Sequence, residues 1–250
     1  MNLTLSGFGR MGRMIKSHAE QRGHHITAVV DPQADDATHR SLDAESCRGA
    51  DAVIDFSAPE AALENIRAAC DAGVPIVVGT TGWYERMDEA RRIVEQAGTG
   101  LIWSGNFSLG VNIFFTLVKA AAQVFDQFSD YDPFVHEFHH NRKADSPSGT
   151  AEMIGNMLLE RIERKNTLAT ETLHRPIRQE ELHVSSTRSG SIPGTHLVSF
   201  DSPVDTVELK HTARTREGFA AGAVAAAEWI AERHGFFAVE EMMNTIIGGK

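Results

Sequence analysis

The sequence predicts an α/β protein in which a Rossmann-like, doubly wound parallel sheet is followed by strands of a second sheet. In the N-terminal part of the chain, short apolar strands alternate with helical patterns. This alternation is typical of a parallel sheet with helices on both faces. Three later segments alternate apolar and polar residues with a period of two, which indicates strands with one solvated or partner-covered face.

The N-terminal segment has the order of a dinucleotide-binding βαβ unit. The apolar strand Leu3–Ser6 leads into the glycine-rich segment Gly7–Gly12, and a helical pattern follows to about Arg22. A second strand, Ile26–Val30, is followed directly by Asp31. Strand, glycine-rich turn, helix, strand and acid in this order indicate a nucleotide site more strongly than the glycines alone.

Each glycine of this turn has a physical role. Gly7 permits the tight turn, Gly9 lets the backbone approach a pyrophosphate, and Gly12 lets the helix pack closely on the strand. The helix N-terminus offers N–H groups and partial positive charge to phosphates, and Asp31 is placed to accept hydrogen bonds from a ribose. A plain tight turn is the alternative. The candidate cofactor-binding residues here are Gly7, Phe8, Gly9, Arg10, Met11, Gly12 and Asp31.

The next segments repeat the alternation of strand and helix. The predicted strands are 51–56, 75–78 and 101–103, and the predicted helices run from the capping box Ser57–Glu60 to about Ala72 and from about Glu85 to Ala97. In such sheets ligands bind beyond the carboxyl ends of the strands, so segments 7–12, 56–57, 79–82 and 104–107 should converge. An ordinary loop is the alternative for 79–82. The further cofactor candidates are Gly79, Thr80, Thr81, Ser104, Gly105, Asn106 and Phe107.

The second half of the chain mixes helices with alternating strands. We expect helices at 109–128 and 148–165, a strand at 131–139, and a loop or edge at 166–180. The period-two strands are 181–188, 196–200 and 206–211. An alanine-rich final helix, about 218–233, should pack closely against the first domain because its residues are small.

The segment Glu137–Thr150 concentrates groups that carry chemistry. It holds the adjacent histidines His139 and His140, then Lys143, Asp145 and a Ser-Gly-Thr turn. Proton donors, a cation and a helix start suit a site that binds an anionic substrate and exchanges protons with it. The alternative is that these histidines are ordinary surface residues without a function.

One segment matches the sequence pattern of zinc proteases, but we do not expect it to bind zinc. His136–His140 reads H-E-x-x-H, a motif that needs a helix to place both histidines on one face. The flanking residues favour a strand, on which residues four apart lie about 13 Å from each other. That separation is too large for one metal ion, so we expect no metal site.

Composition narrows the function further. The 250 residues suffice for one large domain or two modest ones, and the net charge is −10, which disfavours nucleic-acid binding. The sequence has no run of about 20 apolar residues, so we expect no membrane span. The first residues lack the charged-then-apolar order of a signal peptide. Cys47 and Cys70 stand far apart, so we expect reduced thiols in a cytoplasmic protein.

Four motifs together point to one enzyme family. They are Gly7–Gly12 with its Gly-Arg-Met-Gly ending, Gly79–Gly82, Asn106–Asn112 and Glu137–Ala151. The chain resembles the 4-hydroxy-tetrahydrodipicolinate reductases (dihydrodipicolinate reductases) over nearly its whole length. The resemblance implies reduction of 4-hydroxy-tetrahydrodipicolinate to tetrahydrodipicolinate with NADH or NADPH, in lysine and diaminopimelate biosynthesis.

The resemblance also implies domains and residue roles. Residues 1–108 and 217–250 would form the dinucleotide-binding domain, and residues 109–216 would form a mixed-sheet domain for substrate binding and oligomerisation, as a homotetramer. His139 would be the general acid/base and Lys143 the proton donor. His140, Gly149 and Thr150 would contact a dicarboxylate substrate, and Glu137 would be structural.

Two matters stay open at this point. Pro32 follows Asp31 where relatives that bind a 2′-phosphate often have arginine, so NADH is slightly favoured over NADPH, with dual use as an option. Arg10 and Arg13 are nearby cations. The alternative functions are another two-domain dehydrogenase of amino acids or imines, and a nucleotide sensor without catalysis.

Overall fold

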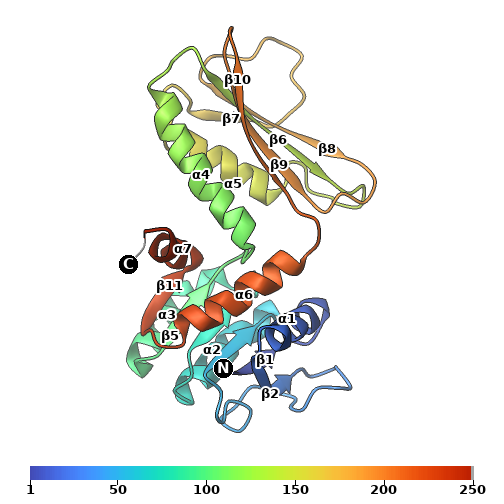
Figure 1. Cartoon of the computed structure of the whole chain (residues 1–250), viewed down its shortest axis with the longest axis vertical. Coiled ribbons are helices and arrows are strands. Elements are labelled where there is room, and N and C mark those ends of the chain that lie inside the picture. The colour runs from blue at the N-terminus through green and yellow to red at the C-terminus, as the bar shows by residue number, and fades with distance from the viewer. Residues whose placement is uncertain (249–250) are drawn as a thin grey trace. The chain divides into compact units, whose positions relative to one another are not determined.

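The computed structural model describes residues 1–248 and divides the chain into two compact units (Figure 1). The first unit comprises Met1–Leu109 and the chain from Glu217 onward, and the second comprises Gly110–Arg216. The first unit has a parallel sheet and the second a mixed sheet, which confirms the predicted fold class.

The sheet of the first unit has six parallel strands in the order β11-β5-β4-β3-β1-β2. The chain builds outward from β1 to β2 and then returns to the other side of β1 with β3. This reversal is the topological switch point at which doubly wound sheets bind ligands. The strands are β1 (Asn2–Ser6), β2 (His25–Val30), β3 (Ala52–Asp55), β4 (Ile76–Val78), β5 (Gly100–Trp103) and β11 (Gly235–Ala238).

Helices cover both faces of this sheet because its strands are apolar on both sides. One core joins Leu5 and Ile54 to Ile15 and to the small residues around Ala223. The other core joins Val53 and Ile76 to the helices on the opposite face. The first face carries α1 (Arg10–Gln21), α6 (Glu217–Ile230) and α7 (Val239–Gly248), and the second carries α2 (Pro59–Asp71) and α3 (Met87–Ala97), with the short η1 (Tyr84–Arg86) before α3.

The second unit has a five-stranded sheet in the order β10-β9-β6-β8-β7, with helices against one face (Figure 1). β6 runs parallel to β8 and antiparallel to β9. The elements are α4 (Leu109–Asp126), β6 (Asp132–His139), α5 (Gly149–Leu159), β7 (Thr167–Ala169), β8 (Glu181–Arg188), β9 (Thr195–Asp201) and β10 (Thr206–Thr212).

Helix α4 is long and apolar enough to cross a membrane by length and composition alone, with a mean hydropathy of 1.3 over 18 residues. It nevertheless serves as a core helix. Phe115, Val118 and Ala122 are buried in the core of the second unit against Val135 and Phe200. The apolar residues of α4 are therefore accounted for by their packing in this core.

Three local predictions need correction. Ser57 does not cap α2: the N-cap is Ala58, without a side-chain cap bond, although Pro59 begins the helix as expected. Helix α5 ends at Leu159 rather than near 165. Ile162 and Lys165 are buried in the irregular segment that follows the helix, so their burial does not reflect a longer helix. β11 and α7 follow the final predicted helix and were not predicted.

Candidate active site

The glycine-rich turn after β1 is built by close backbone packing. Gly7 has φ +86°, and a β-carbon there would lie 2.2 Å from the carbonyl oxygen of Phe56. A β-carbon on Gly12 would lie 2.1 Å from the carbonyl oxygen of Gly7, whereas one on Gly9 would meet no protein atom within 4 Å. Gly7 and Gly12 are therefore required by the fold, and Gly9 leaves open space at the start of α1.

A buried hydrogen-bond network holds the ends of β1, β3 and β4 together. Asp55 is fully buried and accepts hydrogen bonds from Thr80 Oγ1 at 2.6 Å and from Asn65 Nδ2 at 2.8 Å. The same Asn65 nitrogen donates to the hydroxyls of Ser6 and Ser57. Burial raises the pKa of Asp55, and these hydrogen bonds offset part of that rise. The network fixes the three strand ends that border the crevice.

Asp31 is tied to the turn that it follows. Its Oδ2 atom accepts a hydrogen bond from the Phe8 N–H at 2.7 Å, and its Oδ1 atom accepts from Gln33 and Ala34 N–H, each at 2.8 Å. Burial opposes ionisation, but these backbone donors outweigh it, so the pKa of Asp31 lies below its usual value. Asp31 therefore presents a negative charge at the end of β2.

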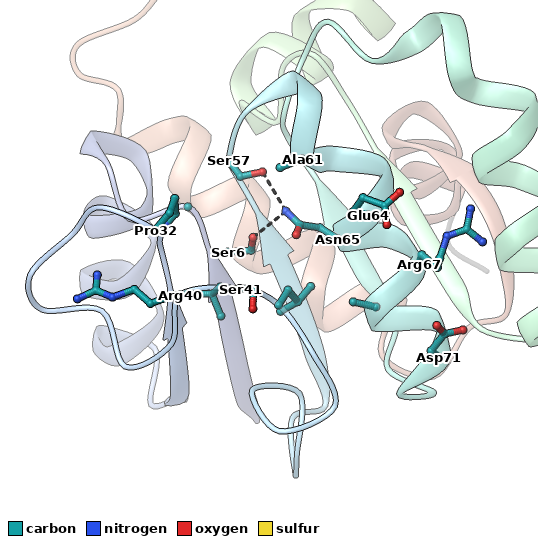
Figure 2. Close-up of a pocket in the computed structure, with 14 residues that line it drawn as sticks. Ser6, Pro32, Arg40, Ser41, Ser57, Ala61, Glu64, Asn65, Arg67 and Asp71 are labelled. Atoms are coloured by element: carbon teal, nitrogen blue, oxygen red, sulfur yellow. Dashed lines mark hydrogen bonds between the residues drawn. The ribbon is translucent and has the colours of Figure 1, made fainter.

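A cavity of about 510 Å³ opens beside this turn. In Figure 2, Pro32 and Arg40 lie on one side of it and Glu64 and Arg67 on the other. Between these two sides, the amide of Asn65 points toward Ser6 and Ser57 (Figure 2). The other lining residues are Gly7, Val30, Ser41, Leu42, Ala61, Ala68 and Asp71.

The segments after β4 and β5 are the other predicted cofactor contacts. The Thr80 hydroxyl donates to Asp55 and accepts from the Ser57 N–H, so only its backbone is available to a ligand. Gly79 lies under the ring of Phe56, and a β-carbon on Gly105 would lie 3.1 Å from the Tyr84 hydroxyl. The turn 104–107 is closed on itself by Ser104, whose hydroxyl bonds the backbone of Asn106.

Most of these predicted residues therefore share one region of the first unit. Gly7, Phe56, Ser57 and Thr80 are joined by direct contacts or hydrogen bonds. The rings of Phe56 and Phe107 lie 6.2 Å apart, centroid to centroid. Arg10 is exposed and Met11 is half-buried in the first turn of α1, and Thr81 is exposed.

In the second unit, strand register gathers four ionisable side chains on the face that the helices cover. Glu137 and His139 alternate with Phe138 along β6, and β8 places Arg188 opposite His139. β9 places His196 opposite Glu137. His136, the first histidine of the H-E-x-x-H letters, lies on the other face of the sheet. Its Nδ1 atom is hydrogen-bonded to the hydroxyl of Ser185 at 2.7 Å.

Glu137 is the buried centre of this group, with a fully buried side chain. Its Oε1 atom accepts from Arg188 Nη2 at 2.6 Å and from the Ser148 N–H at 3.1 Å, and its Oε2 atom contacts Nδ1 of His139. Burial alone would raise the pKa of Glu137. The hydrogen bond from Arg188, the nearby hydroxyl of Ser186 and the positive charge of Arg188 outweigh burial, so the pKa is lowered and the side chain is ionised.

His139 and His196 lie edge to face, with ring centroids 5.3 Å apart. Burial lowers the pKa of His139, although Glu137 acts in the opposite direction and Lys143 and Arg188 add to the decrease. Burial also lowers the pKa of His196, to about 4. In the described part of the chain, Nε2 of His196 has no hydrogen-bond partner.

The remaining predicted residues surround the start of α5. Lys143 Nζ pairs with Asp145 at 2.8 Å and is about one quarter exposed. Ser148 caps the helix by accepting the Ala151 N–H, so Gly149 and Thr150 form its first turn. A β-carbon on Gly149 would meet no atom within 4 Å. His140 is half-buried.

The group Glu137, His139 and His196 offers potential metal-ligand atoms that lie within 4.8 Å of one another. The Arg188 guanidinium already occupies one oxygen of Glu137, and the Lys143 ammonium is near enough to lower the pKa of His139. These two positive charges repel a metal cation, which disfavours metal binding at this group. The arrangement fits a hydrogen-bonded acid–base cluster better than a metal centre.

Sequence patterns do not single out Arg188, His196 or Asn65. Arg188 is 51 residues from Glu137, and their contact depends on the parallel register of β6 and β8. Asn65 looks like one more polar residue of an amphipathic helix. The advance signals were the positions of Arg188 and His196 at the ends of predicted strands.

Comparison with known proteins finds relatives along the whole chain. The family model described as "Dihydrodipicolinate reductase, N-terminus" matches residues 1–107, and the one described as "Dihydrodipicolinate reductase, C-terminus" matches residues 110–243. A 4-hydroxy-tetrahydrodipicolinate reductase of Christiangramia forsetii is 36% identical over 246 residues, which cover 98% of this chain and 99% of that protein. One of Archaeoglobus fulgidus is 35% identical over 267 residues, covering 98% and 100%.

Solved structures share the fold. A dipicolinate-bound dihydrodipicolinate reductase of Paenisporosarcina sp. TG-14 superposes with a TM-score of 0.80 at 21% identity, covering 96% of this chain and 98% of that one. A diaminopimelate dehydrogenase of C. glutamicum superposes with a TM-score of 0.54 at 15% identity, covering 96% and 93%. At these identities the likeness describes architecture alone.

Proposed function

The chain belongs to the 4-hydroxy-tetrahydrodipicolinate reductase family, and on that premise we propose which of its residues bind cofactor and substrate and which move protons. The family reaction is the NAD(P)H-dependent reduction of 4-hydroxy-tetrahydrodipicolinate to tetrahydrodipicolinate in lysine and diaminopimelate biosynthesis. In our proposal the first unit binds the dinucleotide, and the second unit binds the substrate and forms the contacts between subunits.

The first unit fits a dinucleotide. Gly9 leaves open space at the N-terminus of α1, where N–H groups favour a pyrophosphate. The cavity beside Asp31 suits the adenosine part, with Asp31 as an acceptor for ribose hydroxyls. NAD(P)H, when bound, supplies the hydride. The residues proposed to hold it are Gly7 to Gly12, Asp31, Gly79 to Thr81 and Ser104 to Phe107.

The second unit supplies protons and holds carboxylates. Reduction at a ring carbon leaves electron density on the ring nitrogen, which a nearby cationic acid can neutralise. We assign this proton to Lys143, and we assign general acid/base exchange to His139. The first turn of α5, with Gly149 and Thr150, suits a substrate carboxylate because helix N-termini attract anions. His140 completes the substrate contacts.

The observation that carries this assignment is the buried Glu137–His139 pair next to the start of α5. It places a titratable imidazole, a lysine and a helix N-terminus in one cluster of the second unit. The direct test is to follow the oxidation of NADH and of NADPH separately, with substrate generated immediately before use. We expect oxidation that depends on this substrate. Reduction of NAD⁺ or NADP⁺ by diaminopimelate, without substrate-dependent oxidation of NADH or NADPH, would favour the dehydrogenase alternative. Nucleotide binding without turnover would favour a sensor.

We further propose that NADH is preferred and NADPH is accepted. The negative charge of Asp31 disfavours a 2′-phosphate, whereas the exposed Arg40 lines the same cavity. Arg40 Nη1 donates to the carbonyl oxygens of Ala34 at 2.8 Å and of Asp31 at 3.3 Å, and a phosphate could replace these two neutral acceptors.

The Arg40→Ala variant tests this preference. We expect the KM for NADPH to rise about tenfold, equivalent to the loss of about 1.4 kcal/mol, while the KM for NADH changes less than twofold. The matched control is Arg13→Ala, since the Arg13 guanidinium already forms a bidentate pair with Asp36. An equal rise in both KM values for Arg40→Ala would contradict the proposal.

A homotetramer in the cytoplasm is the remaining proposal. Its support is the second sheet, whose edge strand β10 is exposed or half-exposed along its length. Val204, before this strand, is 85% exposed. Natural proteins seldom leave a long strand edge uncovered.

A further inference from the structure

The side chain of Glu137 is fully buried, which is unusual for an acidic residue. An ionised carboxylate without solvent requires partners that offset its charge. Arg188 and the Ser148 N–H both donate to Oε1, which leaves Oε2 for Nδ1 of His139. The carboxylate thus has one oxygen for the scaffold and one for the imidazole.

This contact decides the tautomer of His139. An ionised carboxylate only accepts hydrogen bonds, so Nδ1 must carry the proton. The lone pair of the neutral ring then lies on Nε2, because the bond at one ring nitrogen sets the state of the other. Gly194 keeps space at that atom: a β-carbon there would lie 3.0 Å from Nε2.

Arg188 links the imidazole to the loop that carries the lysine. Its Nη2 atom donates to Glu137 at 2.6 Å and also to the carbonyl oxygen of Asp145 at 2.5 Å. The carboxylate of Asp145 in turn holds the Lys143 ammonium. One guanidinium therefore connects both groups that carry protons.

We infer that Glu137 is a positioning residue that holds His139 in the tautomer with Nε2 open for proton exchange, and that Arg188 joins this pair to the Lys143 loop. The inference deepens the proposed function, because it rests on His139 as the acid/base. It assigns Glu137 a part in turnover, beyond the structural role that the sequence suggested.

The charges around His139 determine the expected pH effect. Glu137 raises the pKa of His139, while burial, Lys143 and Arg188 lower it. Replacement of Glu137 by a neutral residue removes the raising influence, so the His139-dependent limb of the pH–rate profile should move to lower pH. The charged and titratable groups around this ring are Glu137 on β6, Arg188 on β8, His196 on β9, Lys143 and Asp145 in the loop, and His211 on β10 behind His196.

Glu137→Gln is the main test, because the amide can still accept hydrogen bonds from Arg188 and Ser148. Its NH₂ group would donate to Nδ1 and move the ring proton of His139 to Nε2. We expect ¹⁵N NMR of histidine-labelled protein to show Nδ1–H in the parent and Nε2–H in the variant. We expect kcat to fall about 100-fold, with the KM for NADH changed less than twofold.

Glu228→Gln is the matched control, because Glu228 also binds one arginine and one histidine, Arg22 and His24, at 2.8 and 2.7 Å. It lies in the first unit on α6, and its replacement should leave kcat and the pH profile unchanged. Glu137→Asp is a second variant that keeps the charge. It should retain the Nδ1–H tautomer and an intermediate kcat, and it tests the inference even where the glutamine variant folds poorly.

An Nε2–H tautomer in the parent, or an unchanged tautomer and pH profile in Glu137→Gln, would overturn the inference. His139→Gln separates this outcome from a failure of the proposed function. Loss of turnover in His139→Gln with no effect of Glu137→Gln refutes the positioning role alone. Normal turnover in His139→Gln refutes the acid/base role on which the inference rests.

Discussion

Gly9 and Gly12 stand three positions apart in one turn, yet the space around them differs. A β-carbon on Gly12 would collide with the Gly7 carbonyl oxygen at 2.1 Å, while one on Gly9 would enter open space. Gly9 has φ −75°, which any residue can adopt. The fold therefore requires Gly12, whereas the open space at Gly9 supports our proposal that this position lies against the cofactor.

Alanine variants separate these two roles. Gly12→Ala should cost about 3 kcal/mol, at the upper end of overpacking effects, because the obstacle is backbone. Gly9→Ala should change the free energy of unfolding by less than about 0.5 kcal/mol and raise the Kd for NADH at least tenfold. Urea unfolding and calorimetric titration measure both quantities. A large loss of stability in Gly9→Ala would show that the open space is not reserved for a ligand.

Residue roles that depend on local spacing could be predicted from the sequence, and those that depend on distant contacts could not. The spacing of Gly7, Gly9 and Gly12 indicated their separate roles. Asp31 followed a predicted strand, so its place at a strand end was also accessible. The bonds of Asn65 and Arg188 join residues 8 to 59 positions apart and follow from the packing of α2 and the pairing of β6 with β8, which single-residue patterns do not describe.

At the scale of elements, the start of β8 is anchored by an ion pair. Arg175 donates both terminal nitrogens to Glu181, at 2.8 and 2.6 Å, and the Arg178 N–H adds a third bond. The bonds from Arg175 and Arg178 lower the pKa of Glu181 to about 2. They hold the loop before β8 onto the strand that carries Arg188.

This pair predicts a pH dependence of stability. The pKa of Glu181 is lower in the folded chain than its ordinary value of 4.5, so its stabilising contribution is complete above that value and disappears as the pH falls toward 2. The difference in urea midpoint between the parent and Glu181→Gln should therefore shrink over this interval. The control is Glu160→Gln, an exposed carboxylate beside Arg161, whose difference should stay small throughout. A constant gap for Glu181→Gln would contradict the assignment.

Element boundaries were predictable where periodicity was strong. β8 runs from Glu181 to Arg188 as predicted, and α4 begins at Leu109 as predicted. The capping box at Ser57 was wrong because the hydroxyl of Ser57 accepts a hydrogen bond from Asn65 instead. β11 is only four residues long, and a strand of that length completes a sheet through neighbours that the local sequence does not reveal.

At the scale of the molecule, the parallel order of the first sheet followed from the alternation of strands and helices. The mixed order of the second sheet did not follow from residues alone, because period-two patterns do not specify parallel or antiparallel pairing. Family resemblance supplied it. The same resemblance supplied the substrate, since a cluster of histidine, lysine and a helix start describes an anionic substrate only by class.

The homotetramer is tested by the mass of the molecule in solution. Light scattering after size exclusion should give four times the chain mass of 27.4 kDa. Dilution over two orders of magnitude should leave this value unchanged, because obligate interfaces are large and apolar. A mass equal to one chain would contradict the proposal and would leave the exposed side of β10 unexplained.

The most direct test of the central claim is the turnover of Lys143→Ala, measured as substrate-dependent oxidation of NADH, together with its Kd for NADH. The claim that Lys143 and His139 move protons predicts a fall in kcat of about 100-fold or more, with the Kd changed less than twofold. Near-normal kcat in Lys143→Ala would contradict the account.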